Sequence, residues 1–113
     1  MLLLILATSL LQGQSAAQAD KATRAKAFLA ESKFTEAAAL YTELAQQLPG
    51  NPGLLLNQGM ALHMSGADAK AIPPLEAALK LNPNTPPALP FLGASYLRPN
   101  QPAKALTPLD NFA

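Results

Sequence analysis

The sequence contains no cysteine, which excludes disulfides, thiolate chemistry and cysteine-based metal sites. His63 is the sole histidine, so this chain alone cannot form a histidine-based metal site. Charged residues make up only 13% of the sequence, and the formal net charge is +1. Such a balance gives no reason to expect binding to nucleic acid or to a charged membrane surface.

Motifs of catalysis are also missing. The sequence has no glycine-rich phosphate loop and no serine in a nucleophile-elbow motif. Its carboxylates are scattered along the chain, as they are on a solvated surface. We therefore expect these residues to form no catalytic site, and we expect no cofactor and no metal.

Apolar residues are abundant, at 50% of the sequence, so the chain is not of the disordered class. A length of 113 residues allows one domain at most. Many of the 11 prolines gather in three breaker segments, at residues 49–53, 82–87 and 98–102. The chain between these breakers is rich in strong helix formers and predicts helices.

Small and apolar residues recur every 34 positions after about residue 20. The equivalent positions are Ala25, Gly59 and Gly93; Phe28, Leu62 and Tyr96; Ala37, Ala71 and Ala105; Tyr41, Leu75 and Leu109; and Leu44, Ala78 and Phe112. Pro49 and Pro83 are separated by the same interval. A period of this length is typical of repeat architectures, in which each unit buries its apolar face against the next.

Each set has a physical role in a pair of antiparallel helices. A Gly or Ala on the first helix lets the second helix approach closely. The large residue three positions later lies on the same face and fills the space between the two helices. The closing proline ends the second helix, because proline has no N–H and disfavours helix in the residue before it.

The whole pattern resembles the tetratricopeptide repeat (TPR). The third copy contributes Leu89, Leu92, Gly93, Tyr96, Ala105 and Leu109, and the second contributes Leu55, Gly59, Leu62, Ala71, Leu75 and Pro83. The first copy is weaker, with Lys21 and Arg24 where large apolar residues are usual. The resemblance implies an all-α right-handed superhelix of three antiparallel helix pairs, the third truncated. The repeats cover about 20–51, 52–85 and 86–113.

The breakers and turn signals set the expected helix limits. The expected helices are 20–31, 34–48, 54–65 with Gly66 as its C-cap, a helix ending near Leu81, 88–97 and 103–112. Pro73 and Pro74 fall inside the fourth of these. Because proline is tolerated only near a helix start, we expect that helix to start late or to be kinked near Ile72.

Residues 1–19 stand apart from the repeats. They have an apolar run from Leu2 to Leu11 and end in Ala17-Gln18-Ala19. This pattern predicts a secretory signal peptide cleaved after Ala19, and therefore a periplasmic or secreted protein. No Lys or Arg precedes the apolar run. The alternative is an N-terminal helix that packs on the repeats.

The TPR resemblance implies a ligand groove on the concave face, lined by the first helix of each pair. Residues of those helices not used for packing would form it: Ala22, Lys26, Leu29, Leu56, Asn57, Met60, His63, Pro90, Phe91, Ala94, Leu97 and Arg98. Met60 and Leu56 fit a groove wall or ordinary packing between repeats equally well. We expect His63 to be a polar residue at the groove edge, not a pH switch, because the spacing places no carboxylate beside it.

The resemblance implies an interaction module for a protein or peptide partner. The predicted signal peptide makes it an exported module, and the incomplete third repeat predicts that it is the leading part of a larger protein. Some TPR proteins grip a C-terminal acidic residue of heat-shock chaperones. Of the matching positions only Asn57 agrees; the others are Ala22, Lys26, Pro87 and Phe91.

Two alternatives to the exported interaction module remain. The chain is either an accessory domain of an enzyme whose catalytic part follows Ala113, or a structural array that self-associates through an apolar stripe on the last helix.

Overall fold

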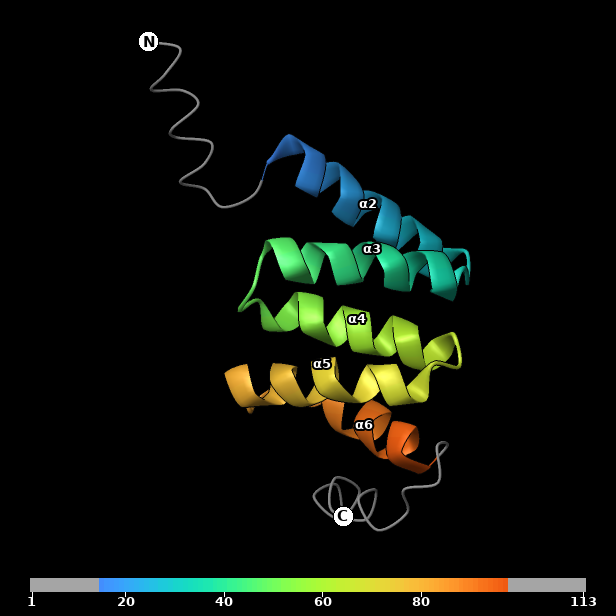
Figure 1. The fold of residues 1–113 in the computed structure, drawn as a ribbon, viewed down its shortest axis with the longest axis vertical. Helices are drawn as coiled ribbons and strands as arrows, with labels where there is room; N and C mark the ends of the chain where they lie inside the picture. The colour runs from blue at the N-terminus through green and yellow to red at the C-terminus, as the bar shows by residue number, and fades with distance from the viewer. Residues whose placement is uncertain (1–14, 98–113) are drawn as a thin grey trace.

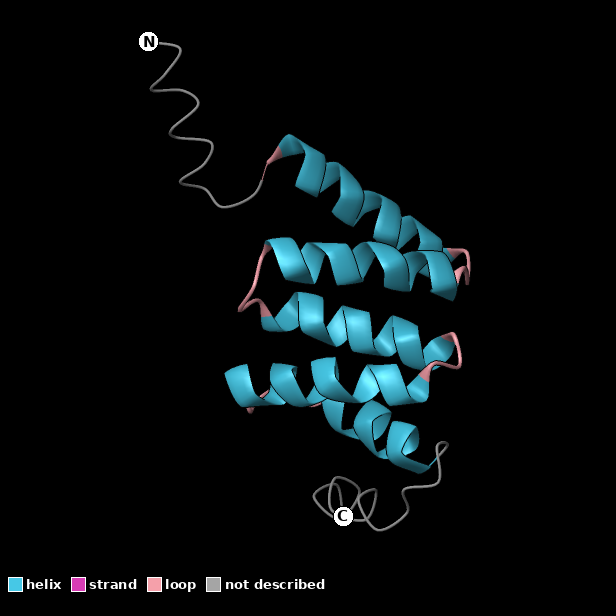
Figure 2. Ribbon diagram, in the orientation of Figure 1, coloured by secondary structure: helices cyan, strands magenta, loops and turns pink. Residues whose placement is uncertain are grey.

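The structure is a computed structural model that describes residues 15–97. Five helices make up this region, and it contains no strand (Figure 2). They are α2 (Ala16–Ala30), α3 (Phe34–Gln47), α4 (Pro52–Met64), α5 (Asp68–Leu81) and α6 (Ala88–Leu97). They stack in chain order, each helix against the next, and α4 also contacts α6 (Figure 1). The predicted all-α stack of helix pairs is therefore confirmed for α2 to α6.

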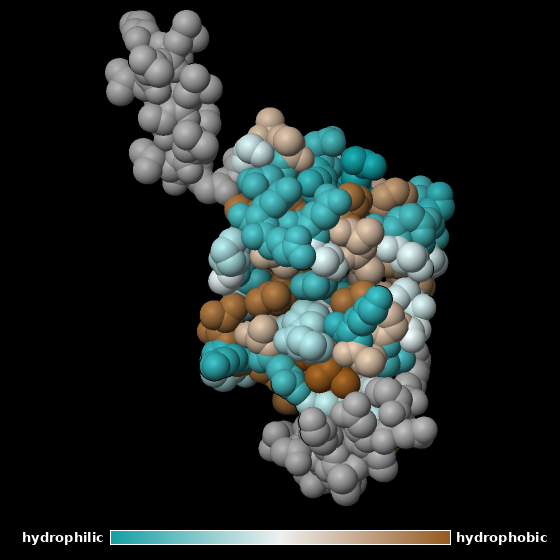
Figure 3. Space-filling model, viewed as in Figure 1, coloured by the Kyte–Doolittle hydropathy of each residue, from teal (hydrophilic) through white to brown (hydrophobic). Residues whose placement is uncertain are grey.

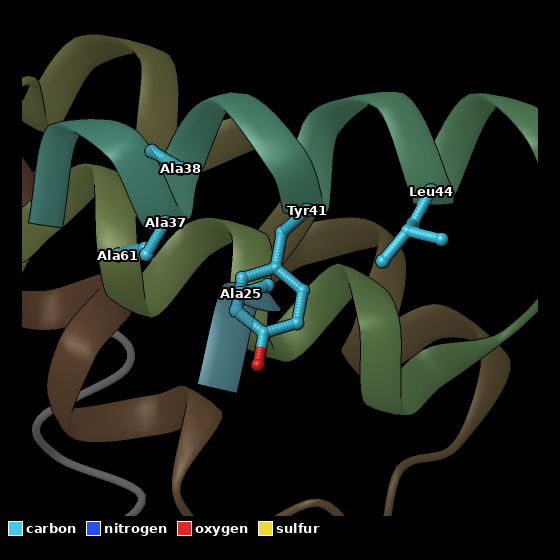
Figure 4. Packing of buried hydrophobic residues seen from close by; sticks show 6 residues of the cluster. All are labelled: Ala25, Ala37, Ala38, Tyr41, Leu44 and Ala61. Carbon is cyan, nitrogen blue, oxygen red and sulfur yellow. The ribbon is translucent and has the colours of Figure 1, made fainter. Parts of the chain in front are cut away.

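The repeat period accounts for the core. One cluster joins α2, α3 and α4 and is centred on Tyr41 (Figure 4); its buried members are Ala25, Ala37, Ala38, Tyr41, Leu44 and Ala61. A second cluster joins α5 and α6 and consists of Ala71, Leu75, Ala88, Leu92 and Tyr96. Partly buried Leu62 packs against both. Burying a residue the size of Leu44 or Leu75 stabilises the fold by roughly 1.5–3 kcal/mol.

Gly59 is the point of closest approach between α4 and α5. A Cβ atom built there would lie 2.5 Å from Cγ of Leu75 and 3.3 Å from the carbonyl oxygen of Ala71. Leu75 and Ala71 are both fully buried, so neither side has room to move away. The small residue predicted at this position is therefore required by packing.

Helices α2 and α4 end in the same way, one repeat apart. After α4, the Gly66 N–H donates to the His63 carbonyl and the Ala67 N–H donates to the Leu62 carbonyl. This is a Schellman motif, which places Gly66 at a positive φ of 90°. After α2, the same two hydrogen bonds place Ser32, a residue with a Cβ atom, at a φ of 59°.

Helix α2 begins at Ala16, so the expected start at Asp20 is wrong by four residues. The reason is a capping box: the Ser15 hydroxyl accepts from the Gln18 N–H, and the Gln18 side chain accepts from the Ser15 N–H. Cleavage after Ala19 would remove both partners. The apolar run of the predicted leader lies in 1–14, outside the described residues.

Helix α5 starts directly after the turn, at Asp68, so the expectation of a late start is wrong. Pro73 and Pro74 lie inside it. They cannot donate to the carbonyls of Ala69 and Lys70, but both of these residues are exposed, and water can take the place of the missing donors. Pro74 is buried, and the packing of the α5 face outweighs the unfavourable propensity of proline.

The expected turn at 98–102 and the last helix at 103–112 lie outside the described residues. Within 15–97, no helix combines the length and apolar character needed to cross a bilayer.

Candidate functional site

Helix α4 lies at the centre of the described stack, and its faces can be assigned from their contacts. Gly59 faces α5, and His63 faces α6, where its ring meets the ring of Phe91 edge to face at a centroid distance of 5.6 Å. Ala61 faces the first cluster, between α2 and α3. Because successive residues turn by about 100° around a helix, Asn57, Met60 and Met64 share the face between the side turned to α6 and the side turned to the first cluster.

We call the surface formed by Lys26 of α2, by Asn57, Met60 and Met64 of α4, and by Phe91 and Ala94 of α6 the first-helix surface. One repeat period separates Lys26 from Met60 and Met60 from Ala94, so the three occupy equivalent positions in successive repeats. Met64 is 48% exposed. It was not among the residues predicted from the sequence, although its spacing of four from Met60 was the signal that could have found it.

The remaining predicted groove residues have different environments. Leu29 packs against the first core cluster, and Leu56 and Phe91 pack against the second. Asn57, Met60 and Ala94 are half-buried, Lys26 and Pro90 are exposed, and Leu97 is 50% exposed. Arg98 lies outside the described residues. Leu56 thus packs against α5 and α6 in the second cluster, whereas Met60 is half-buried and belongs to neither cluster.

Charge is distributed unequally along the stack, and α2, the first helix of the first pair, carries four charged residues: Asp20, Lys21, Arg24 and Lys26. The segments of α4 and α6 contain no Asp, Glu, Lys or Arg, while α3 carries Glu36 and Glu43 and α5 carries four charged residues. On the face shown in Figure 3, hydrophilic side chains gather over the first helix pair, and hydrophobic ones are more frequent at the level of α4 and α5. The α4 and α6 part of the first-helix surface is therefore uncharged and suited to apolar contacts.

His63 is buried, with an exposed fraction of 6%, and it has a carboxylate partner. Its Nδ1 lies 2.5 Å from Oδ1 of Asp68, and Oγ of buried Ser95 lies 3.3 Å from the same nitrogen. The expectation that no carboxylate lies beside His63 is wrong. The turn that ends α4 brings residue 68 back alongside residue 63, which helical spacing alone does not reveal.

These three residue types also occur in catalytic triads, but their arrangement here is different. In a triad, the serine contacts one ring nitrogen of the histidine and the carboxylate contacts the other. Here Ser95 and Asp68 both approach Nδ1. The ring therefore cannot relay the serine proton through its other nitrogen, and this geometry fits a structural link between α4, α5 and α6. Within 15–97, moreover, there is no group of three or more His, Cys, Asp or Glu residues suited to hold a metal ion.

The comparisons with known proteins identify the fold. No protein-family model matches the chain, and no curated protein matches it. Among solved structures, it is similar to the Sgt2 TPR domain from Aspergillus fumigatus, with a TM-score of 0.73 and 24% sequence identity. The match covers 86% of this chain and 64% of that one, so the chain spans just under two thirds of the Sgt2 domain. The described helices thus have the TPR fold, as the repeat period predicts.

Proposed function

We propose that this chain is a protein-interaction module, and that the first-helix surface binds a partner segment with uncharged, apolar side chains. The observation that carries the proposal is the exposure of Met64 beside Met60, on a helix without charged residues. Methionine side chains are flexible and polarisable, and they adapt to apolar partners of varied shape. The TPR fold, which typically serves as an interaction module and not as an enzyme, supports this proposal.

The test compares apolar-to-charged changes on two surfaces. The chain is applied to an array of uncharged apolar peptides, and binding is quantified for Met60→Glu, Met64→Glu and Leu81→Glu. Leu81 is a matched control, because it is 51% exposed and lies at the end of α5, away from the first-helix surface. We avoid Leu56, because a charge there would disturb the second core cluster.

We expect each methionine change to weaken peptide binding by about tenfold or more, the effect of losing a buried contact of about 1.4 kcal/mol. Leu81→Glu should leave binding unchanged, and circular dichroism should show that all three variants fold. Full binding by both methionine variants, or an equal loss in the Leu81 variant, would contradict the assignment.

Export of the module is a separate proposal, supported by the apolar run at Leu2–Leu11 and by Ala17-Gln18-Ala19. The intact mass of the natural protein tests it. A chain beginning at Asp20 would support export, and it would lack the Ser15 and Gln18 capping box of α2. A chain that retains residues 1–19 would overturn the predicted cleavage.

A further inference from the structure

A hollow of ≈ 430 Å³ lies on the side of α4 turned away from the first-helix surface. Gln58 and Leu62 of α4 form part of its wall. Each is two residues from Met60 and therefore points about 200° around the helix from it. Residues of α3, including Ala38, and the start of α5 with Lys70 complete the wall. The hollow is thus separate from the surface to which we assign the proposed function.

The hydrogen bonds within the wall fix some polar groups and leave others available. The Thr42 hydroxyl donates to the Ala38 carbonyl at 2.7 Å and accepts from Nε2 of Gln58 at 3.3 Å. Gln58 is held in this orientation and retains a second amide N–H for another acceptor. The Thr35 hydroxyl and the Lys70 ammonium add further donors from exposed positions.

The wall of the hollow includes no Asp or Glu. Within residues 15–97, Lys70 also makes no ion pair of 4.0 Å or less. The wall therefore combines one cation, several hydrogen-bond donors and the apolar side chains of Ala38 and Leu62. An acceptor-rich, negatively charged group with an aliphatic neighbour complements this wall.

We propose that this hollow is a second docking site, for a partner-protein segment that places an Asp or Glu carboxylate at Lys70 and an adjacent aliphatic side chain over Ala38 and Leu62. A protein segment fits better than an enclosed small molecule, because Thr35 and Lys70 on the rim are exposed and leave room for a chain to enter and leave. The volume lies within the range of about 300–1,000 Å³ typical of ligand pockets. Because the two sites lie on opposite sides of α4, one module can hold two segments at once.

Two capped peptides that differ at one residue test the carboxylate requirement. Ala-Leu-Glu-Leu-Ala and Ala-Leu-Gln-Leu-Ala are titrated into the isotope-labelled chain and followed by the amide NMR signals of Thr42, Gln58 and Lys70. We expect the Glu peptide to shift these signals and to bind about fivefold tighter than the Gln peptide, the effect of one partly exposed ion pair. Lys70→Gln should remove this preference, and Lys70→Arg should retain it.

Lys80→Gln is the matched control, because Lys80 is an exposed lysine of the same helix that does not line the hollow. It should leave the Glu preference unchanged. The site would be overturned by any of three results. These are no NMR shifts at the hollow, equal binding of both peptides, or an equal loss of the Glu preference in the Lys80 variant. Hexanoate, a small aliphatic carboxylic acid, is the last ligand to be compared. Tighter binding of hexanoate than of the Glu peptide would assign the hollow to small carboxylic acids and overturn the docking of a protein segment.

Discussion

The Nδ1 atom of His63 lies 2.5 Å from Oδ1 of Asp68, and both side chains are buried where α4 turns into α5. In the first repeat, the equivalent positions hold Leu29 and Phe34, an apolar pair. The second repeat thus uses a polar pair where the first uses an apolar one. Ser95 of α6 approaches the same His63 nitrogen, so the pair also links the second repeat to the third.

Loss of one member of this pair should be costly, because the other remains buried without it. We expect His63→Leu to lower the free energy of unfolding by about 1–3 kcal/mol, the usual cost of depriving a buried polar group of a hydrogen-bond partner. Urea unfolding followed by circular dichroism measures this change.

The first repeat supplies the control. His63→Leu combined with Asp68→Phe recreates its Leu29 and Phe34 pair, and removing both polar partners is often neutral. The double variant should therefore recover most of the stability lost in the single variant. If the double variant were as unstable as His63→Leu alone, the cost would come from packing around residue 63 and not from the lost contact between His63 and Asp68.

The contact between Gly59 and Leu75 predicts the effect of a single methyl group. Gly59→Ala places a Cβ atom 2.5 Å from Leu75 Cγ, so α4 and α5 must move apart. We expect a loss of about 1–3 kcal/mol, as is typical of overpacked cores. Gly53→Ala in the same helix meets only Oδ1 of Asn51, at 3.3 Å, which caps α4 by accepting from the Leu54 N–H. Its gain in helix propensity is offset by pressure on this cap, so we expect a change of less than about 1 kcal/mol. Thermal unfolding of both variants checks the difference, and equal effects would contradict the close approach.

Ser32 and Gly66 occupy the same position in two Schellman motifs, and only one of them is glycine. A positive φ is unfavourable for a residue with a Cβ atom. We therefore expect Ser32→Gly to raise the free energy of unfolding by about 0.5–1 kcal/mol, and Gly66→Ala to lower it by about 1 kcal/mol. The urea concentrations at the unfolding midpoints of the two variants should therefore move in opposite directions from that of the natural chain. A destabilised Ser32→Gly chain would indicate that the Ser32 side chain stabilises the turn in another way.

The fold could be predicted from the sequence because its main determinants recur with the repeat period. The small residues Ala25 and Gly59 and the large residues Tyr41 and Leu75 are buried where the period places them. The limits of the helices were harder to predict from the sequence. The start of α2 depends on the Ser15 capping box, which extends the helix by one turn beyond the repeat pattern.

The candidate site was predictable only in part. Helical spacing places Lys26, Met60 and Ala94 at equivalent positions of successive repeats, because these positions depend on the period alone. It could not find the pairing of His63 with Asp68, which arises because the Schellman turn folds the chain back. Nor could it find the hollow beside Gln58, which requires the distance between α3 and α5. Contacts across a turn and empty volumes depend on three-dimensional packing, which a one-dimensional period does not describe.

Tyr41 provides a prediction about alkaline pH. Its ring lies in the first core cluster, beside Ala25 (Figure 4), and its hydroxyl has no hydrogen-bond partner in the described structure. Burial raises the pKa of the Tyr41 phenol above its ordinary value of 10.0, because the charged form loses its hydration. The neutral form is thus favoured in the folded state, whereas the unfolded chain ionises near pH 10. The resulting contribution to stability is fully present below that pH and is lost as the pH rises above it.

Tyr41→Phe should change both the stability at neutral pH and its dependence on alkaline pH, because it removes an unsatisfied hydroxyl and the ionisable group together. We expect the variant to be more stable than the natural chain by about 1 kcal/mol at neutral pH, and its advantage should grow between pH 10 and pH 11. Tyr96→Phe is the matched control, since the Tyr96 hydroxyl donates to the Glu76 carboxylate and its removal should destabilise the chain. Urea unfolding of the three proteins across this pH range measures both effects. A destabilised Tyr41→Phe chain would show that the Tyr41 hydroxyl has a partner, such as a buried water molecule, that stabilises the core.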